Sequence, residues 1–237
     1  MNAYKFLHAG GLSTFSGFSW PLPDGGVAGA WVATEDERAR WSSGIHACDA
    51  GGLVDWIDDE LWIIELEDAV SASEGVLVGR RGRLVQRVNE WSPGAARELG
   101  EACVWRFRDR VVEALNRNGL EADADRIART ADLDELQRSA VDNGSDEDEV
   151  RSGLAYLRDV VELSRGGRPD TCRGATAEDA GPGAITANLA YVSAVAAGAL
   201  DATRTGDATS FATTFDSERA WQRQWLHDRL ALSEQSG

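Results

Sequence analysis

Residues 61–100, LWIIELEDAVSASEGVLVGRRGRLVQRVNEWSPGAARELG, contain the change of pattern that decides the fold. The stretch opens with LWIIEL and then VLV, short apolar runs rich in β-branched residues, which are typical of strands. It closes with Ser92 and Pro93, a capping hydroxyl followed by proline at the first helical position, which is a helix start signal. The sequence therefore predicts strands up to Trp91 and helices after it.

Upstream of this stretch, glycine and proline turn signals separate further short runs that are typical of strands. We expect strands at residues 3–7, 15–20 and 30–33, and a short helix at residues 50–59.

Downstream of Trp91 the apolar residues recur at helical spacing, as in Val104, Phe107, Val111 and Leu115. Further helices are expected at residues 132–141, from a cap at Ser145, and from a cap at Asp216 or Ser217. Several helices joined by loops indicate an antiparallel bundle. The predicted fold class is α+β, with a β-rich unit at residues 1–91 packed on a helical bundle at residues 92–237.

Composition is typical of a soluble chain that can bury a sizeable core without disulfides, since 43% of its 237 residues are hydrophobic. Three widely spaced cysteines, Cys48, Cys103 and Cys172, fit neither a disulfide framework nor a metal ribbon. The N-terminal residues lack the apolar run of a signal peptide, so we expect a cytoplasmic location. The most apolar segment, residues 185–200, is short for a bilayer span, so no membrane association is expected.

The net charge of −16 limits the partners that the chain can bind. Of 40 acidic residues 14 lie up to Trp91, together with 7 of the 24 basic ones, so neither half has a basic face suited to phosphate backbones. An acidic surface repels nucleic acid and favours a basic protein partner.

Two resemblances to known families arise from particular segments. Gly44-Ile45-His46-Ala47-Cys48, after the aromatic opening YKFL, resembles the Gly-Phe/Ile-His-Ala-Cys motif of an uncharacterised phage and actinobacterial module. That resemblance covers about the first ninety residues and implies no activity. The helical segments NLAYVSAVAAGALDA and SERAWQRQWLHDRL resemble an alanine-rich family of immunity proteins, which implies an antidote-like role.

His46, Cys48 and Asp49 are the candidate catalytic residues, should the protein be an enzyme. On a strand, His46 and Cys48 share one face, so the imidazole could lower the thiol pKa and activate a nucleophile, with Asp49 orienting His46. The alternative is that both side chains fill a core or turn, which is common for cysteine.

No metal site or cofactor is predicted. His8, His46, Cys48, Cys172 and His227 have no recognisable ligand spacing, and the paired glycines lack the lysine of a phosphate loop. Asp55, Asp58 and Asp59 share a face of the predicted short helix. We favour the interpretation that these carboxylates are solvated, over acid–base catalysis or the binding of a hard cation.

Six of the nine tryptophans lie at or before Trp91. They either line an aromatic pocket for a flat ligand or form the bulky core of a small domain. For the pocket, the candidate ligand-binding residues are Trp20, Trp41, Trp56 and Trp62.

Three classes of function remain. The first is a noncatalytic interaction or immunity-like protein whose acidic surface meets a basic partner. The others are a cofactor-independent enzyme and a small-molecule binding or self-resistance protein, both using a tryptophan-lined pocket near His46 and Cys48 for an aromatic or polyketide-like molecule. The sequence leaves the oligomeric state undetermined.

Overall fold

The computed structural model describes residues 1–34, 44–140, 145–166 and 180–232, and confirms the α+β class. The chain divides into two compact units. The sheet unit consists of Met1–Arg97 with Gly181–Ala187 and Arg223–Gly237, and the helical unit of Glu98–Ala180 with Asn188–Gln222. The sequence placed a boundary at Trp91, whereas the sheet unit continues into the first helix and includes two later segments.

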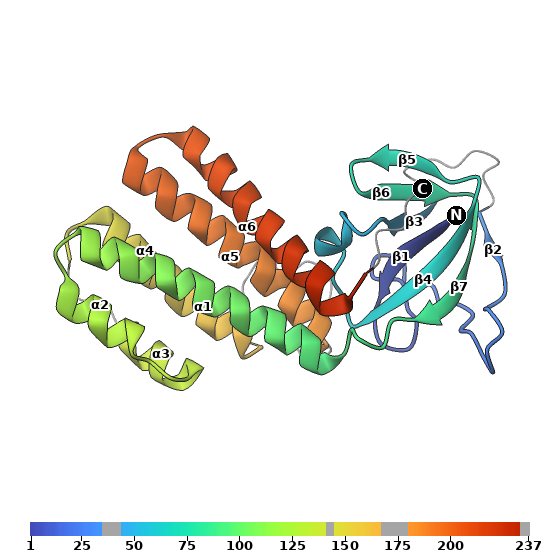
Figure 1. The fold of residues 1–237 in the computed structure, drawn as a ribbon, viewed down its shortest axis with the longest axis horizontal. Coiled ribbons are helices and arrows are strands. Elements are labelled where there is room, and N and C mark those ends of the chain that lie inside the picture. The colour runs from blue at the N-terminus through green and yellow to red at the C-terminus, as the bar shows by residue number, and fades with distance from the viewer. Residues whose placement is uncertain (35–43, 141–144, 167–179, 233–237) are drawn as a thin grey trace. The chain divides into compact units, whose positions relative to one another are not determined.

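Seven strands of the described chain form one antiparallel sheet in the order β2-β7-β4-β1-β3-β6-β5 (Figure 1). The predicted strands at residues 3–7, 61–66 and 76–78 are confirmed. The strands are β1 (Asn2–Leu7), β2 (Val32–Ala33), β3 (Ile45–Cys48), β4 (Glu60–Glu67), β5 (Val70–Ser73), β6 (Val76–Gly79) and β7 (Arg81–Arg87).

Two sequence predictions in this unit are wrong. Residues 15–20 form a turn and not a strand, and the expected helix at 50–59 is reduced to one 3₁₀ turn, Leu53–Asp55.

The sheet is curled at the junction of β6 and β7. These strands lie four places apart in the order β7-β4-β1-β3-β6, yet a single residue, Arg80, joins them along the chain. A flat sheet would hold them far more than one residue apart, because neighbouring strands are about 4.8 Å apart. The curl encloses a core to which β1, β3, β4, β6 and β7 all contribute: Ala3, Leu7, Trp20, Ile45, Ala47, Trp62, Ile64, Leu66, Leu77 and Leu84.

Six helices follow in the described part of the chain. They are α1 (Pro93–Arg117), α2 (Glu121–Ala128), α3 (Leu133–Ser139), α4 (Asp148–Ser164), α5 (Pro182–Thr205) and α6 (Ala208–Leu230).

Side-chain hydrogen bonds cap the starts of α1, α3 and α6, and not all of these caps were predicted. Ser92 Oγ accepts from the Ala95 N–H at the start of α1, as expected, and Asp132 caps α3 through the Glu135 N–H. Ser145 does not cap α4, which begins three residues later. The expected cap at Asp216 or Ser217 is wrong, because α6 begins at Ala208 and Asp207 accepts from the Thr209 N–H.

Helices α1 to α5 share the core of the helical unit, around Phe107, Val111, Leu154 and Leu200. Helix α5 has 24 residues, and an 18-residue apolar window within it has a mean hydropathy of 1.4. By length and composition it could therefore span a membrane, which corrects the expectation that this segment is too short. However, 56% of that apolar window is buried inside the protein, as in the core helix of a soluble protein. The alanines of α5, such as Ala196 and Ala197, are part of this packing.

Candidate functional site

An exposed apolar turn follows β1 in the sheet unit. Between residues 9 and 34, Asp24 is the only charged residue, although 27% of the whole chain is charged. Five of the eight exposed large hydrophobic side chains found on the described residues lie in this segment: Leu12, Phe15, Phe18, Leu22 and Val27. We call residues 13–18 the aromatic turn, because Phe15, which is 87% exposed, and Phe18 lie on it.

Hydrogen bonds close the aromatic turn tightly. The Ser13 N–H donates to the Phe18 carbonyl at 2.9 Å and the Gly17 N–H donates to the Ser13 carbonyl at 2.9 Å. Gly17 adopts a φ of +64°, a left-handed conformation that glycine adopts without strain. The indole N–H of Trp20 donates to Ser13 Oγ at 2.8 Å, which holds the base of the turn against the core.

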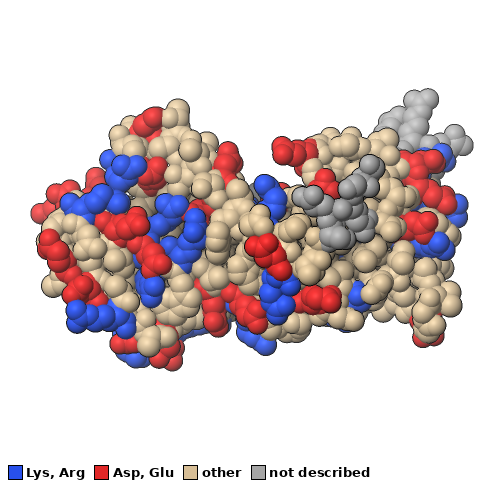
Figure 2. Space-filling model, in the orientation of Figure 1, with Lys and Arg blue, Asp and Glu red and all other residues tan. Residues whose placement is uncertain are grey.

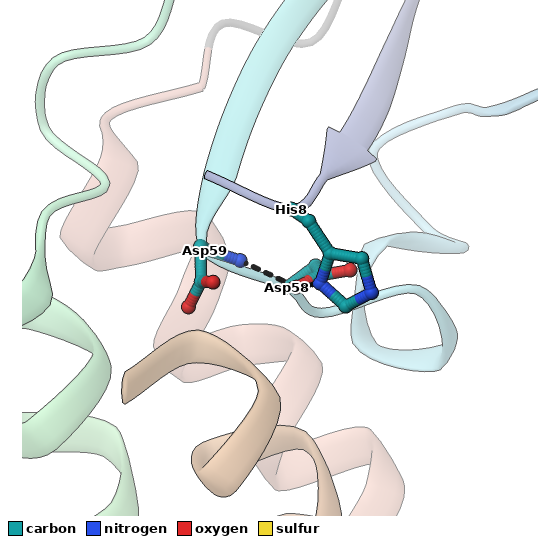
Figure 3. A group of neighbouring side chains, drawn as sticks. All are labelled: His8, Asp58 and Asp59. Carbon is teal, nitrogen blue, oxygen red and sulfur yellow. Dashed lines mark hydrogen bonds and ion pairs between the residues drawn. The ribbon is translucent and has the colours of Figure 1, made fainter. Parts of the chain in front are cut away.

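A buried carboxylate fastens the turn to the sheet. Asp58, only 1% exposed, accepts from Thr14 Oγ1 at 2.6 Å through one oxygen. Its other oxygen lies 2.8 Å from His8 Nδ1 and also accepts the Asp59 N–H at 2.8 Å. Figure 3 shows the imidazole of His8 turned toward Asp58. The pairing of Leu7 with Glu60 in β1 and β4 explains this proximity, because His8 directly follows one strand and Asp58 lies two residues before the other.

Burial and hydrogen bonding act in opposite directions on Asp58. Burial raises the pKa of the carboxyl above its ordinary value, while the hydrogen bonds from Thr14 and Asp59 and the interaction with His8 favour the charged form. The donors from Thr14 and Asp59, with the imidazole of His8 beside them, are an arrangement suited to an ionised carboxylate.

Asp58 and Asp59 also bind two further segments of the sheet unit, at Trp91 and at the start of α5. The Asp58 carbonyl accepts the indole N–H of Trp91 at 2.7 Å. Asp59 Oδ1 accepts the Gly183 N–H at 2.9 Å, so its carboxylate lies at the positive N-terminal end of α5. A Cβ on Gly183 would lie 2.2 Å from the Asp58 carbonyl oxygen, so only glycine permits this approach.

Within the described residues, His8, Asp58 and Asp59 form one group of possible metal ligands, with ligand atoms within 4.8 Å of one another. A histidine held at Nδ1 by a buried carboxylate is also the arrangement that orients a general base. In this structure, however, protein donors bind both oxygens of Asp58 and one oxygen of Asp59. The observed contacts therefore describe a fastener for the turn and for α5.

The predicted catalytic residues lie on or beside β3, and their surroundings do not activate a thiol. Cys48 is 1% exposed and its Sγ lies 3.6 Å from the Tyr4 carbonyl oxygen. Burial, together with the charges of Asp49 and Asp55, raises the pKa of Cys48 far above its ordinary value, and Lys5 opposes this only in part. Asp49 accepts the Gly52 N–H at 2.9 Å, in the turn that leads into the 3₁₀ helix. Cys48 is thus a core residue, as in the alternative interpretation.

The structure describes three of the four predicted ligand-binding tryptophans. Trp20 and Trp62 are buried in the core of the sheet unit, where the Trp62 indole donates to Glu60 Oε2 at 3.1 Å. Trp56 is half-buried, with its ring 6.3 Å from that of His46 and 6.2 Å from that of Phe15. Trp41 lies outside the described residues.

Sequence reasoning missed Phe15, Thr14 and the pairing of His8 with Asp58. The available signal for Phe15 was the single charge between residues 9 and 34. No local signal joins His8 to Asp58, which are 50 residues apart, and the interpretation of Asp58 as a solvated carboxylate is wrong.

No protein-family model, curated protein or solved structure matches the chain.

Proposed function

We propose that this chain is a noncatalytic interaction protein, acting in an immunity-like manner, that binds a basic protein partner through the aromatic turn. The observation that supports the proposal is Phe15, which is 87% exposed on a turn that a buried carboxylate fastens in place. An exposed apolar patch on a soluble protein marks an interaction surface when it is larger than scattered single residues.

The fastening gives the backbone that carries Phe15 and Phe18 a fixed geometry before any partner arrives. Binding costs conformational entropy for every segment that it orders, and a preorganised turn has lost that entropy on folding. Aromatic side chains near the centre of an interface contribute most of its binding energy. A rigid Phe15 and Phe18 therefore fit the role of anchors.

Charge selects the kind of partner. The net charge of −16 favours association with a basic protein and disfavours another acidic one. Figure 2 shows acidic and basic side chains interspersed over the face in view, so the net charge alone does not define a binding place there. The uncharged turn supplies that place.

The test compares affinity capture by the wild-type chain and by a Phe15→Ala, Phe18→Ala double variant, followed by identification and purification of the captured proteins. We expect a basic protein on the wild type, with affinity at least tenfold weaker for the double variant and falling as salt rises. Tyr191→Ala is the matched control, because Tyr191 is a 53% exposed aromatic residue of the helical unit. Equal capture by wild type and double variant, or an acidic partner, would contradict the proposal.

An enzyme working through His46 and Cys48 is not proposed, because burial suppresses the thiolate on which that chemistry depends. The same residue environment offers no support for a small-molecule site built on Cys48.

A further inference from the structure

Phe15 belongs to a row of three aromatic rings at one end of the sheet unit. Its ring meets Trp56 edge-on, with centroids 6.2 Å apart and an interplanar angle of 83°. Trp56 in turn stacks on His46, with centroids 6.3 Å apart and an angle of 25°. Trp56 is half-buried, so Phe15 is the exposed end of the row.

Five other tryptophans of the described residues are covered by cations of the chain itself. Lys5 lies over Trp20, Arg87 over Trp62, Arg106 over Trp221 and Arg108 over Trp105, and both Arg81 and Arg83 lie over Trp31. Over the described residues, no lysine or arginine is found on the Phe15 and Trp56 rings. Trp56 is thus of a residue type that this chain pairs with a cation at five other positions, while the described residues supply no cation to it.

Three exposed acidic residues lie on the segments at the same end of the sheet. Trp56 directly follows the exposed Asp55, and Asp49 begins the turn that leads to the 3₁₀ helix. The Asp49 N–H donates to the Gly75 carbonyl at 3.2 Å, which brings the exposed Glu74 to this end as well. The Coulomb influence of both Asp49 and Asp55 on Cys48 is consistent with their closeness to β3.

Lys5, a cation among the described residues of this region, is already engaged. Its Nζ donates to the His46 carbonyl at 2.6 Å and lies 5.2 Å from the centre of the Trp20 ring. It therefore interacts with the core side of β3 and with a different tryptophan.

We infer that the Phe15 and Trp56 rings form a binding site for a cationic side chain, arginine or lysine, of the basic partner. The negative face of an exposed aromatic ring attracts such a cation, and the acidic rim of Asp49, Asp55 and Glu74 strengthens the attraction. Arginine fits the site better than lysine, because its planar guanidinium is weakly hydrated and stacks on aromatic rings. The inference rests on the proposed function and specifies its chemistry.

The test titrates the full chain with three short peptides made of glycine and serine. The peptides differ only at three positions, where the first carries arginine, the second neutral citrulline and the third leucine. Binding is followed by calorimetry and by the indole N–H signals in nuclear magnetic resonance spectra. We expect the arginine peptide to bind about fivefold more tightly than the citrulline peptide. Phe15→Leu, which keeps an apolar side chain but removes the ring, should lose that fivefold preference, whereas Phe15→Trp should keep it.

Folding of the variants is checked by thermal melts, which we expect to match the wild type because Phe15 is exposed. Tyr191→Ala is again the control, since Tyr191 meets Phe215 edge-on at 5.8 Å and is likewise exposed. It should leave the arginine preference unchanged.

Three outcomes would overturn the inference: no binding of the arginine peptide at millimolar concentration, equal binding of the leucine peptide, or an unchanged preference in Phe15→Leu. In each of these cases the proposed function would still stand if the Phe15→Ala, Phe18→Ala variant no longer captured the basic partner. If that variant captured the partner as well as the wild type does, the proposed function would fail too.

Discussion

Asp58 is the side chain on which most of the candidate site depends. Its oxygens accept from Thr14 and Asp59 and contact His8, while its backbone carbonyl accepts from Trp91. Removing the buried carboxylate leaves the donors of Thr14 and Asp59 without their acceptor, which costs more than the hydrogen bonds themselves contribute.

Replacing Asp58 by alanine should lower the free energy of unfolding by about 3 kcal/mol, because buried donors lose a charged acceptor. Urea unfolding measures the change. Asp24→Ala, which removes an exposed carboxylate of the same unit, should alter stability by less than about 0.5 kcal/mol. If Asp58→Ala were as stable as Asp24→Ala, the network would not fasten the turn.

Lys5 gives a prediction for the pH dependence of stability. Burial lowers the pKa of Lys5 from 10.5 to about 8, so between these values the unfolded chain binds more protons than the folded chain. The contribution of Lys5 to stability should therefore rise with pH from 8 to 10.5, by on the order of 1 kcal/mol.

Melting temperatures of the wild type and Lys5→Met across this pH range isolate the Lys5 contribution, because other titrating groups are common to both proteins. The difference between them should shift in favour of the wild type as pH rises. A constant difference would show that Lys5 titrates in the folded state as it does in water.

The first residues of α5 lie in the sheet unit and depend on a close approach to the backbone of Asp58. Gly183 lies against the Asp58 backbone, with no room for a Cβ, and its N–H donates to Asp59. Gly183→Ala should destabilise the protein by about 2 kcal/mol, because the contacting atoms are backbone and cannot move aside.

Gly94→Ala on α1 is the matched change, since the nearest atom to its Cβ is Ser92 Oγ at an ordinary 3.5 Å. It should stabilise the protein by about 0.5–1 kcal/mol through helix propensity. Chemical unfolding of both variants measures this, and a Gly183→Ala protein as stable as Gly94→Ala would contradict the close packing.

The sequence predicted the elements that carry a regular apolar pattern and missed those decided by distant contacts. LWIIEL and the Ser92-Pro93 start became β4 and α1 as expected. Residues 15–20 were predicted as a strand, but the left-handed Gly17 and the hydrogen bonds of Ser13 with Phe18 and Gly17 make a turn there. Alternation along a strand predicted that His46 and Cys48 share one face. The pairing of His8 with Asp58 depends instead on the register between β1 and β4, which no local pattern encodes.

Charge on the whole molecule gives a prediction that does not depend on any site. With a net charge of −16, the protein should not shift DNA or RNA in a gel at physiological ionic strength, because phosphate backbones require basic partners. The proposed basic partner, in contrast, should bind and should dissociate as salt rises. Tight nucleic-acid binding under those conditions would overturn the electrostatic argument.

The sheet unit is assembled from three separated segments, and its earliest strand, β1, lies inside the sheet between β4 and β3 (Figure 1). During synthesis on the ribosome, β1 has no partner until residues of β3 and β4 have left the exit tunnel. The segments after Gly181 and Arg223 arrive far later, so the unit is completed only once residues beyond Arg223 have been synthesised. A message broken or stalled before that point therefore yields a chain without a finished sheet unit, which is a substrate for chaperones and proteases and not a partly active protein.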